Sequence, residues 1–188
     1  MYHGERFNAY SHLAGSMLAV AALVLMTVKA NGPYQLASAL TYGICLILLY
    51  LGSTLYHSIP QPKIKAILQK VDHCMIYLLI AGSYTPFTLI PLKGGWGWSL
   101  FGLSWGLALF GIIQELTIGR KSEKRLLSMM IYVIMGWLIL VAVSPLVRTL
   151  PFAGLFWLAL GGILYSAGIY WFAAKCIFRG FFKQQSSW

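Results

Sequence analysis

Polar residues that could do chemistry flank the junction between two long apolar segments. Ser53 and His57 lie at the end of the first segment, and Asp72 and His73 open the second. Four positions separate Ser53 from His57, so a helix places both on one face, a turn apart. Such a pair can orient an imidazole or hold a water, and a nearby carboxylate can accept a hydrogen bond from a histidine or a metal-bound water. These residue types predict a metal-binding or proton-transfer site.

The surrounding sequence has the composition of a membrane protein. Of its 188 residues, 59% are hydrophobic and only 10% are charged, whereas a soluble domain carries about 25% charged residues. Several apolar stretches exceed the roughly 18 residues that cross a bilayer. We therefore expect an all-α integral membrane protein.

Six membrane-spanning helices are predicted from the apolar stretches. They cover residues 11–29, 35–57, 72–92, 97–116, 127–147 and 152–174. Turn-forming residues such as Asn31-Gly32-Pro33 separate the stretches. Since no internal repeat or soluble segment interrupts them, residues 1–188 are expected to form a single membrane domain, one helical bundle.

The distribution of lysine and arginine predicts how the bundle is oriented. Eleven of the 14 basic residues fall on the side of the membrane that holds the N-terminus, and three, Lys29, Lys93 and Arg148, fall on the other. Short cytoplasmic loops retain such residues, so both termini are expected in the cytoplasm. The formal charge of +10 then faces anionic lipid, and membrane lipids rather than nucleic acid are the expected partners.

This orientation brings the ends of the first three spans to one side of the membrane. Besides the residues named first, Glu5 and His12 lie there. Ionisable groups at membrane depth usually face a bundle interior or a wet cavity, which favours a shared site. Simpler roles remain open at this point. Asp72 could serve the dipole of its own helix, Ser11 could be an N-cap with His12 at the interface, and Glu5 could compensate Arg6.

Several stretches resemble one protein family up to about residue 172. They include "GERFNAYSHLAG" (4–15), "STLYHSIP" (53–60), "VDHCMIYLLIAGSYTPF" (71–87) and "GLFWLALGGILYSAGIYWF" (154–172). They resemble the hemolysin III family, the bacterial branch of the progestin and adiponectin receptor superfamily. The resemblance implies a seven-helix bundle with a cytoplasmic N-terminus in a bacterial plasma membrane.

The resemblance also implies a zinc-dependent hydrolase that acts on an amide or ester lipid. By motif, His57 corresponds to a zinc ligand, Asp72 to an aspartate that acts near the zinc through water, and Ser53 to a serine of the same constellation. The family's other two ligands belong to an H-x-x-x-H motif on the seventh helix.

The sequence departs from the family pattern after Lys175. Residues 175–188 are expected to form a non-matching cytoplasmic tail, and no histidine follows His73. A catalytic zinc site generally has three protein ligands. Beyond His57, the ligands would have to come from Asp72, His12, Glu5, His73 or another chain. Without a seventh helix, the chain could be a shortened product, could self-associate through the surface left open, or could be an intact six-helix variant.

Two other functions compete with lipid hydrolysis. A non-enzymatic receptor-like protein, or a factor in membrane-lipid homeostasis, needs the same bundle without a complete zinc site. The family name suggests a pore-forming cytolysin as a third interpretation. An aqueous pore requires a polar lining, and no predicted helix carries a polar stripe along its length, which argues against this interpretation.

Overall fold

The computed structural model describes residues 2–118 and 122–185, and these residues form only helices and their connections. Only the backbone is described for His3, for Ile118, and for the segments 122–126 and 172–185. The chain divides into two compact units, Met1–Ala142 and Val143–Trp188. Because the described residues form only helices and their connections, the predicted all-α fold is confirmed. Each unit is described by itself below.

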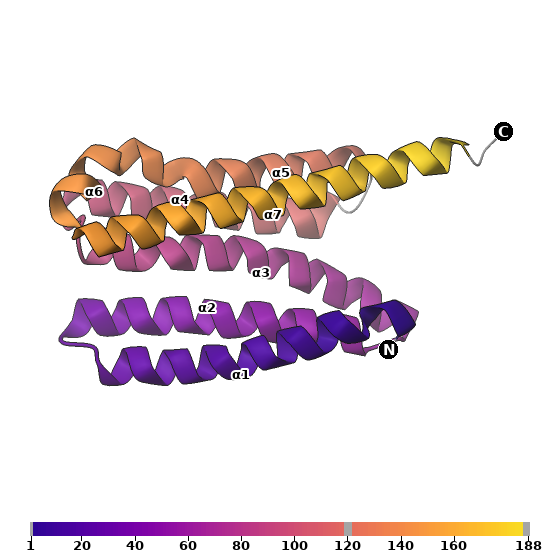
Figure 1. Cartoon of the computed structure of the whole chain (residues 1–188), viewed down its shortest axis with the longest axis horizontal. Helices are drawn as coiled ribbons and strands as arrows, with labels where there is room; N and C mark the ends of the chain where they lie inside the picture. Colours follow the sequence, from indigo (N-terminus) through magenta and orange to yellow (C-terminus); the bar gives the residue numbers. More distant parts are fainter. Residues whose placement is uncertain (1, 119–121, 186–188) are drawn as a thin grey trace. The chain divides into compact units, whose positions relative to one another are not determined.

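The first unit contains five long helices and two short 3₁₀ helices (Figure 1). In chain order they are η1 (His3–Glu5), α1 (Arg6–Val28), α2 (Pro33–Ser58), α3 (Pro62–Leu89), α4 (Gly95–Ile118), α5 (Ser122–Trp137) and η2 (Leu138–Ala142). The second unit contains α6 (Val143–Thr149) and the long α7 (Phe152–Gln185).

Proline and glycine mark the helix starts in the first unit. Pro33 and Pro62 occupy the first turn of α2 and α3, where the missing N–H has no intrahelical partner to lose. Gly32 and Gly94 precede α2 and α4 with φ angles of 95° and 104°, a backbone region that favours glycine. The turns therefore lie where the sequence placed them.

Helices α1, α2 and α3 run antiparallel and pack in chain order, and α3 also contacts α4 and α5 (Figure 1). Glycine permits close approach at these interfaces. A Cβ atom at Gly15 would meet the ring of Tyr50 at 2.7 Å, and one at Gly82 would meet Sγ of Cys45 at 2.9 Å. The first three helices therefore pack at distances that a larger side chain would prevent.

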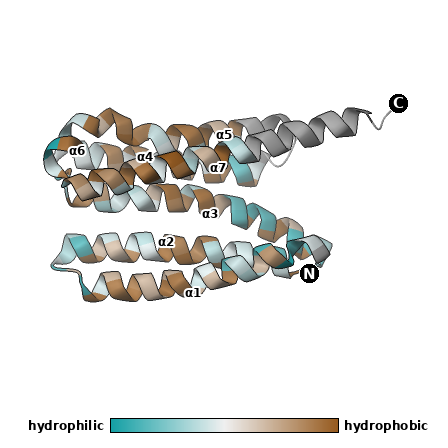
Figure 2. Ribbon diagram, in the orientation of Figure 1, coloured by the Kyte–Doolittle hydropathy of each residue, from teal (hydrophilic) through white to brown (hydrophobic). Residues whose placement is uncertain are grey.

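Among the described residues, five helical segments are long and apolar enough to span a membrane: Arg6–Val28, Pro33–Ser58, Gly95–Thr117, Leu127–Thr149 and Phe152–Trp171. The third expected span, 72–92, follows α3 as far as Leu89 and extends three residues past the end of that helix. α3 is not among these five segments. Its helix begins ten residues earlier, at Pro62, and its first turns carry Lys63, Lys65 and Lys70, so this end is hydrophilic (Figure 2).

Besides the start of α3, two predicted helix ends were wrong. α1 starts at Arg6 instead of 11, so Ser11 lies inside the helix, where its Oγ donates to the carbonyl of Asn8 at 3.1 Å; it is not an N-cap. The last helix continues to Gln185 rather than ending at 174. The span expected over 127–147 is confirmed as the apolar segment Leu127–Thr149, but its backbone is divided into α5, η2 and α6.

Tyr84 compensates for this division. Its Oη donates to the carbonyl of Met135 at 2.6 Å and accepts from the N–H of Ile139 at 2.9 Å. Where an α-helix changes to a 3₁₀ helix at membrane depth, the freed backbone groups need partners because no water replaces them. The buried phenol of α3 supplies both a donor and an acceptor.

We predict that Tyr84→Phe destabilises the protein by about 1–3 kcal/mol, because it leaves buried backbone groups unsatisfied. The measurement is the thermal unfolding midpoint in detergent micelles. Tyr10→Phe is the matched control, since the Tyr10 side chain is 65% exposed. Equal midpoints for the two variants would contradict the role assigned to Tyr84.

Candidate functional site

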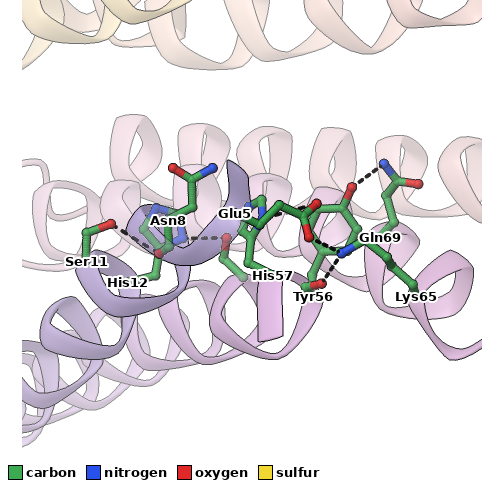
Figure 3. Close-up of polar contacts among 9 residues, drawn as sticks. Glu5, Asn8, Ser11, His12, Tyr56, His57, Lys65 and Gln69 are labelled. Carbon is green, nitrogen blue, oxygen red and sulfur yellow. Dashed lines mark hydrogen bonds and ion pairs between the residues drawn. The ribbon is translucent and has the colours of Figure 1, made fainter. Parts of the chain in front are cut away.

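Polar side chains gather where the start of α1, the end of α2 and the start of α3 meet (Figure 3). Glu5 comes from η1, His12 from α1, and Ser53 and His57 from the last two turns of α2. Lys65 follows from the first turn of α3. The predicted convergence of the first three helices on one group of ionisable residues is therefore observed.

Ser53 joins α2 to α1 through His12. Its hydroxyl, in a residue only 4% exposed, lies 2.5 Å from Nδ1 of His12. The His12 ring also packs edge-on against the rings of Tyr50 and His57, with centroids 5.8 and 6.0 Å away. Ser53 thus orients an imidazole as expected, but that imidazole belongs to His12 rather than to the same-face His57.

His57 presents an uncommitted ring nitrogen. Its Nδ1 is buried and has no hydrogen-bond partner within the described part of the chain. Oε1 of Glu5 lies 3.8 Å from this nitrogen. Asp72 also interacts electrostatically with the ring. A buried polar atom without a partner is costly, so the nitrogen is suited to a ligand that the protein alone does not supply.

Glu5 is held by a lysine that the sequence analysis did not single out. Nζ of Lys65 donates to Oε2 of Glu5 at 2.7 Å and to the carbonyl of Tyr56 at 2.9 Å, and it lies 4.5 Å from the centroid of the Tyr56 ring. Gln69 donates to the Tyr56 hydroxyl at 2.7 Å. Glu5 therefore pairs across helices instead of compensating Arg6.

Lys65 could have been found by its position. Only a short turn separates it from the end of α2, so the first turn of α3 has to lie beside Tyr56 and His57. The loop lysines were assigned only to the anionic lipid surface, and this role in the site was missed.

Two other ionisable residues lie in separate contacts. Nδ1 of His73 is 2.6 Å from the carbonyl of Gln69 in its own helix, and its backbone carbonyl accepts from Tyr132 at 3.1 Å. Glu115, 7% exposed, accepts a hydrogen bond of 3.1 Å from Ser128. The side chain of His3 lies outside the described residues.

The donors fit a zinc ion only in part. Across the described residues, no group of three or more His, Cys, Asp or Glu side chains is placed to hold a metal. His57 offers a free nitrogen, while Nδ1 of His12 is engaged by Ser53. Asp72 is close enough to act on His57 electrostatically. The expected ligands lie in one region without completing a three-ligand set.

We expect Ser53→Ala to destabilise the protein by about 1–2 kcal/mol, because the half-buried His12 ring loses the partner of its Nδ1 atom. Ser16→Ala is the control: Ser16 is also buried, but its hydroxyl has no hydrogen-bond partner among the described residues. Thermal unfolding in micelles measures both variants. A Ser53→Ala midpoint equal to that of Ser16→Ala would show that the contact between α1 and α2 contributes nothing.

Comparison with known proteins gives consistent matches over nearly the whole chain. A family model described as "Haemolysin-III related" matches residues 1–186. The chain is 45% identical to Hemolysin-3 of Bacillus cereus over 171 residues, covering 89% of this chain and 77% of that protein. It is 44% identical to the Hemolysin-3 homolog of Bacillus subtilis (strain 168) over 176 residues, covering 92% and 82%.

A more distant match reaches vertebrate proteins. The monocyte to macrophage differentiation factor of Homo sapiens is 27% identical over 181 residues, covering 90% of this chain and 71% of that protein. No solved structure gives a significant match.

Proposed function

Because this chain belongs to the haemolysin III family, we propose that it is a zinc-dependent membrane hydrolase acting on an amide or ester bond of a lipid. The site is the cluster of Glu5, His12, Ser53, His57 and Asp72. The observation that carries the proposal is the buried, unpartnered Nδ1 of His57, with carboxylates acting on its ring.

Each side chain has a distinct role in this proposal. His57 would hold the ion through its free nitrogen, and Asp72 would accept a proton from the attacking water. Ser53 positions His12, and Lys65 keeps Glu5 beside His57. A zinc ion, when bound, acidifies water and polarises a carbonyl.

The zinc ligands needed beyond His57 would come from outside this cluster. A second copy of this chain is the partner we propose for that role, through self-association. A purified chain that is monomeric at saturating zinc would contradict the self-association, and analytical ultracentrifugation in detergent measures it.

We further propose that the cluster faces the cytoplasm of a bacterial cell, with both termini on that side. The support is the excess of basic residues on the N-terminal side of the membrane, eleven against three. Single cysteines introduced at Lys63 and at Lys93, in a background without other cysteines, should react from opposite sides with a membrane-impermeant thiol reagent. Labelling of Lys63→Cys from outside intact cells would reverse the orientation.

Hydrolysis is tested with the purified full chain in micelles, supplied with zinc and a panel of fluorescent amide and ester lipids. We expect turnover that a zinc chelator abolishes and that added zinc restores. If no lipid in the panel turns over while zinc is bound, the hydrolase proposal fails.

The incomplete ligand set favours a second candidate, a non-enzymatic receptor-like or lipid-homeostasis protein. That function needs the bundle but not a competent metal. Its signature is a change in membrane-lipid composition on expression that persists in Asp72→Ala. If Asp72→Ala abolishes the change, the enzymatic proposal is favoured instead.

Cell lysis, suggested by the names of the two Bacillus relatives, ranks third. Many side chains exposed on α1, including Phe7, Met17 and Leu25, are large and apolar, as expected of a surface that faces lipid. Dye release from vesicles at a low protein-to-lipid ratio would raise this candidate above the others.

A further inference from the structure

A groove lies at the end of the first three helices opposite the Glu5–His57 cluster. It has a volume of about 340 Å³ and is formed by the end of α1, the start of α2 and the end of α3. Six of its lining residues are apolar: Leu25, Met26, Ala30, Ala39, Pro86 and Ile90. The volume is at the low end of the range of about 300–1,000 Å³ for ligand sites, enough for a chain rather than a whole lipid.

A buried serine in the groove points to an occupant that carries a polar group beside its apolar part. Ser38 lines the groove, is 3% exposed, and has a hydroxyl without a hydrogen-bond partner among the described residues. Serine in a membrane helix ordinarily bonds to a carbonyl in the preceding turn, and Ser38 does not. Its hydroxyl is free to donate to a ligand oxygen.

Charge at this end of the helices is positive. Lys29 lines the groove, and Nζ of Lys93 lies 4.8 Å from the ring centroid of Tyr34. Segments 25–42 and 86–98, which form this end, contain no acidic residue. Without a carboxylate in these segments to neutralise the lysines, an anionic ligand is the complementary partner.

Exposed aromatic residues place the same end at a membrane interface. Tyr34, Trp96 and Trp98 are 48%, 52% and 60% exposed. Tyrosine and tryptophan concentrate at the level of lipid head groups. The groove therefore opens where an acyl chain meets its head group.

We propose that this groove binds an anionic phospholipid of the surrounding bilayer. One acyl chain occupies the apolar groove, Ser38 donates to the ester carbonyl, and Lys29 pairs with the phosphate. This site is separate from the cluster at the other end and does not depend on the proposed hydrolysis.

Native mass spectrometry of the full chain in micelles tests the proposal with added phosphatidylglycerol and phosphatidylcholine. We expect the wild type to bind the first lipid about five- to tenfold more tightly, as expected for one uncompensated cation near a phosphate. Lys29→Gln should remove this preference. Lys63→Gln should retain it, because Lys63 lies in the first turn of α3, far from the end of α3 that lines the groove.

Two further variants test the groove itself. Ile90→Trp places a larger side chain at a residue that is already 37% exposed, so it should fill the groove without disturbing the core and lower the affinity for both lipids. Leu18→Trp, on an exposed face of α1, should leave both affinities unchanged. Binding to Ile90→Trp equal to the wild type, or a preference retained in Lys29→Gln, would overturn the proposal.

Discussion

Asp72→Asn is expected to lower lipid turnover by about 10²–10⁴-fold, the usual contribution of a positioned acid or base. Asparagine keeps the size and polarity of the side chain but cannot accept the proton. The Asp72 carboxylate interacts electrostatically with His57, so its loss acts directly on the proposed centre. The measurement is turnover of the fluorescent lipids at saturating zinc.

Zinc content measured on the same sample separates the two roles considered for Asp72. Retained zinc with lost turnover assigns it proton transfer, whereas loss of both makes it a metal ligand. Glu115→Gln is a control at another acidic residue, one that is held by Ser128 between α4 and α5. Wild-type turnover in Asp72→Asn would remove Asp72 from the chemistry.

Gly111→Ala is expected to lower the stability of the protein by about 1–3 kcal/mol, the usual cost of overpacking a core. A Cβ atom there would overlap the ring of Tyr77, which is fully buried and packs against Tyr132 with centroids 4.5 Å apart. The buried Tyr77 ring is packed against Tyr132, so it cannot move away from the added methyl group as a flexible side chain could. The thermal unfolding midpoint in micelles measures the loss.

Gly106→Ala provides a control in the same helix, α4. Nothing lies within 4 Å of a Cβ atom at Gly106, so alanine should leave stability unchanged or raise it by up to about 1 kcal/mol through helix propensity. If Gly111→Ala is as stable as Gly106→Ala, α3 and α4 do not pack as closely as described.

The sequence predicted the part of the fold that depends on local patterns. Long apolar runs and the turns at Gly32-Pro33 and Pro60–Pro62 determine where helices lie, because each signal acts within a few residues. The start of α3 was missed for the opposite reason. Its first turns are polar, and hydropathy alone assigns such residues to a loop even where the backbone continues as a helix.

The division of the fifth span could not be predicted from its own residues. Segment 127–147 is apolar throughout most of its length and reads as one helix. The change to a 3₁₀ helix at Leu138–Ala142 is stabilised by Tyr84, which lies more than fifty residues earlier. A partner so distant in sequence is visible only after α3 and α5 are packed.

The site was predictable by location but not by pairing. Topology brings Glu5, His12 and His57 to one end of the bundle, and that much follows from helix direction. Which imidazole Ser53 contacts depends on how α1 is rotated about its axis, which a spacing of four residues on α2 cannot reveal. The Glu5–Lys65 pair was likewise hidden, because loop lysines were assigned only to the lipid surface.

The most direct test of a metal centre at the α1–α3 cluster is the zinc content of the purified full chain. After dialysis against a weak chelator, elemental mass spectrometry should find close to one zinc per chain in the wild type, as for a mononuclear site. His57→Ala should lose the metal and His73→Ala should keep it, since the His73 ring is bound to its own helix. Equal zinc in the wild type and His57→Ala, or none in the wild type, would contradict the account.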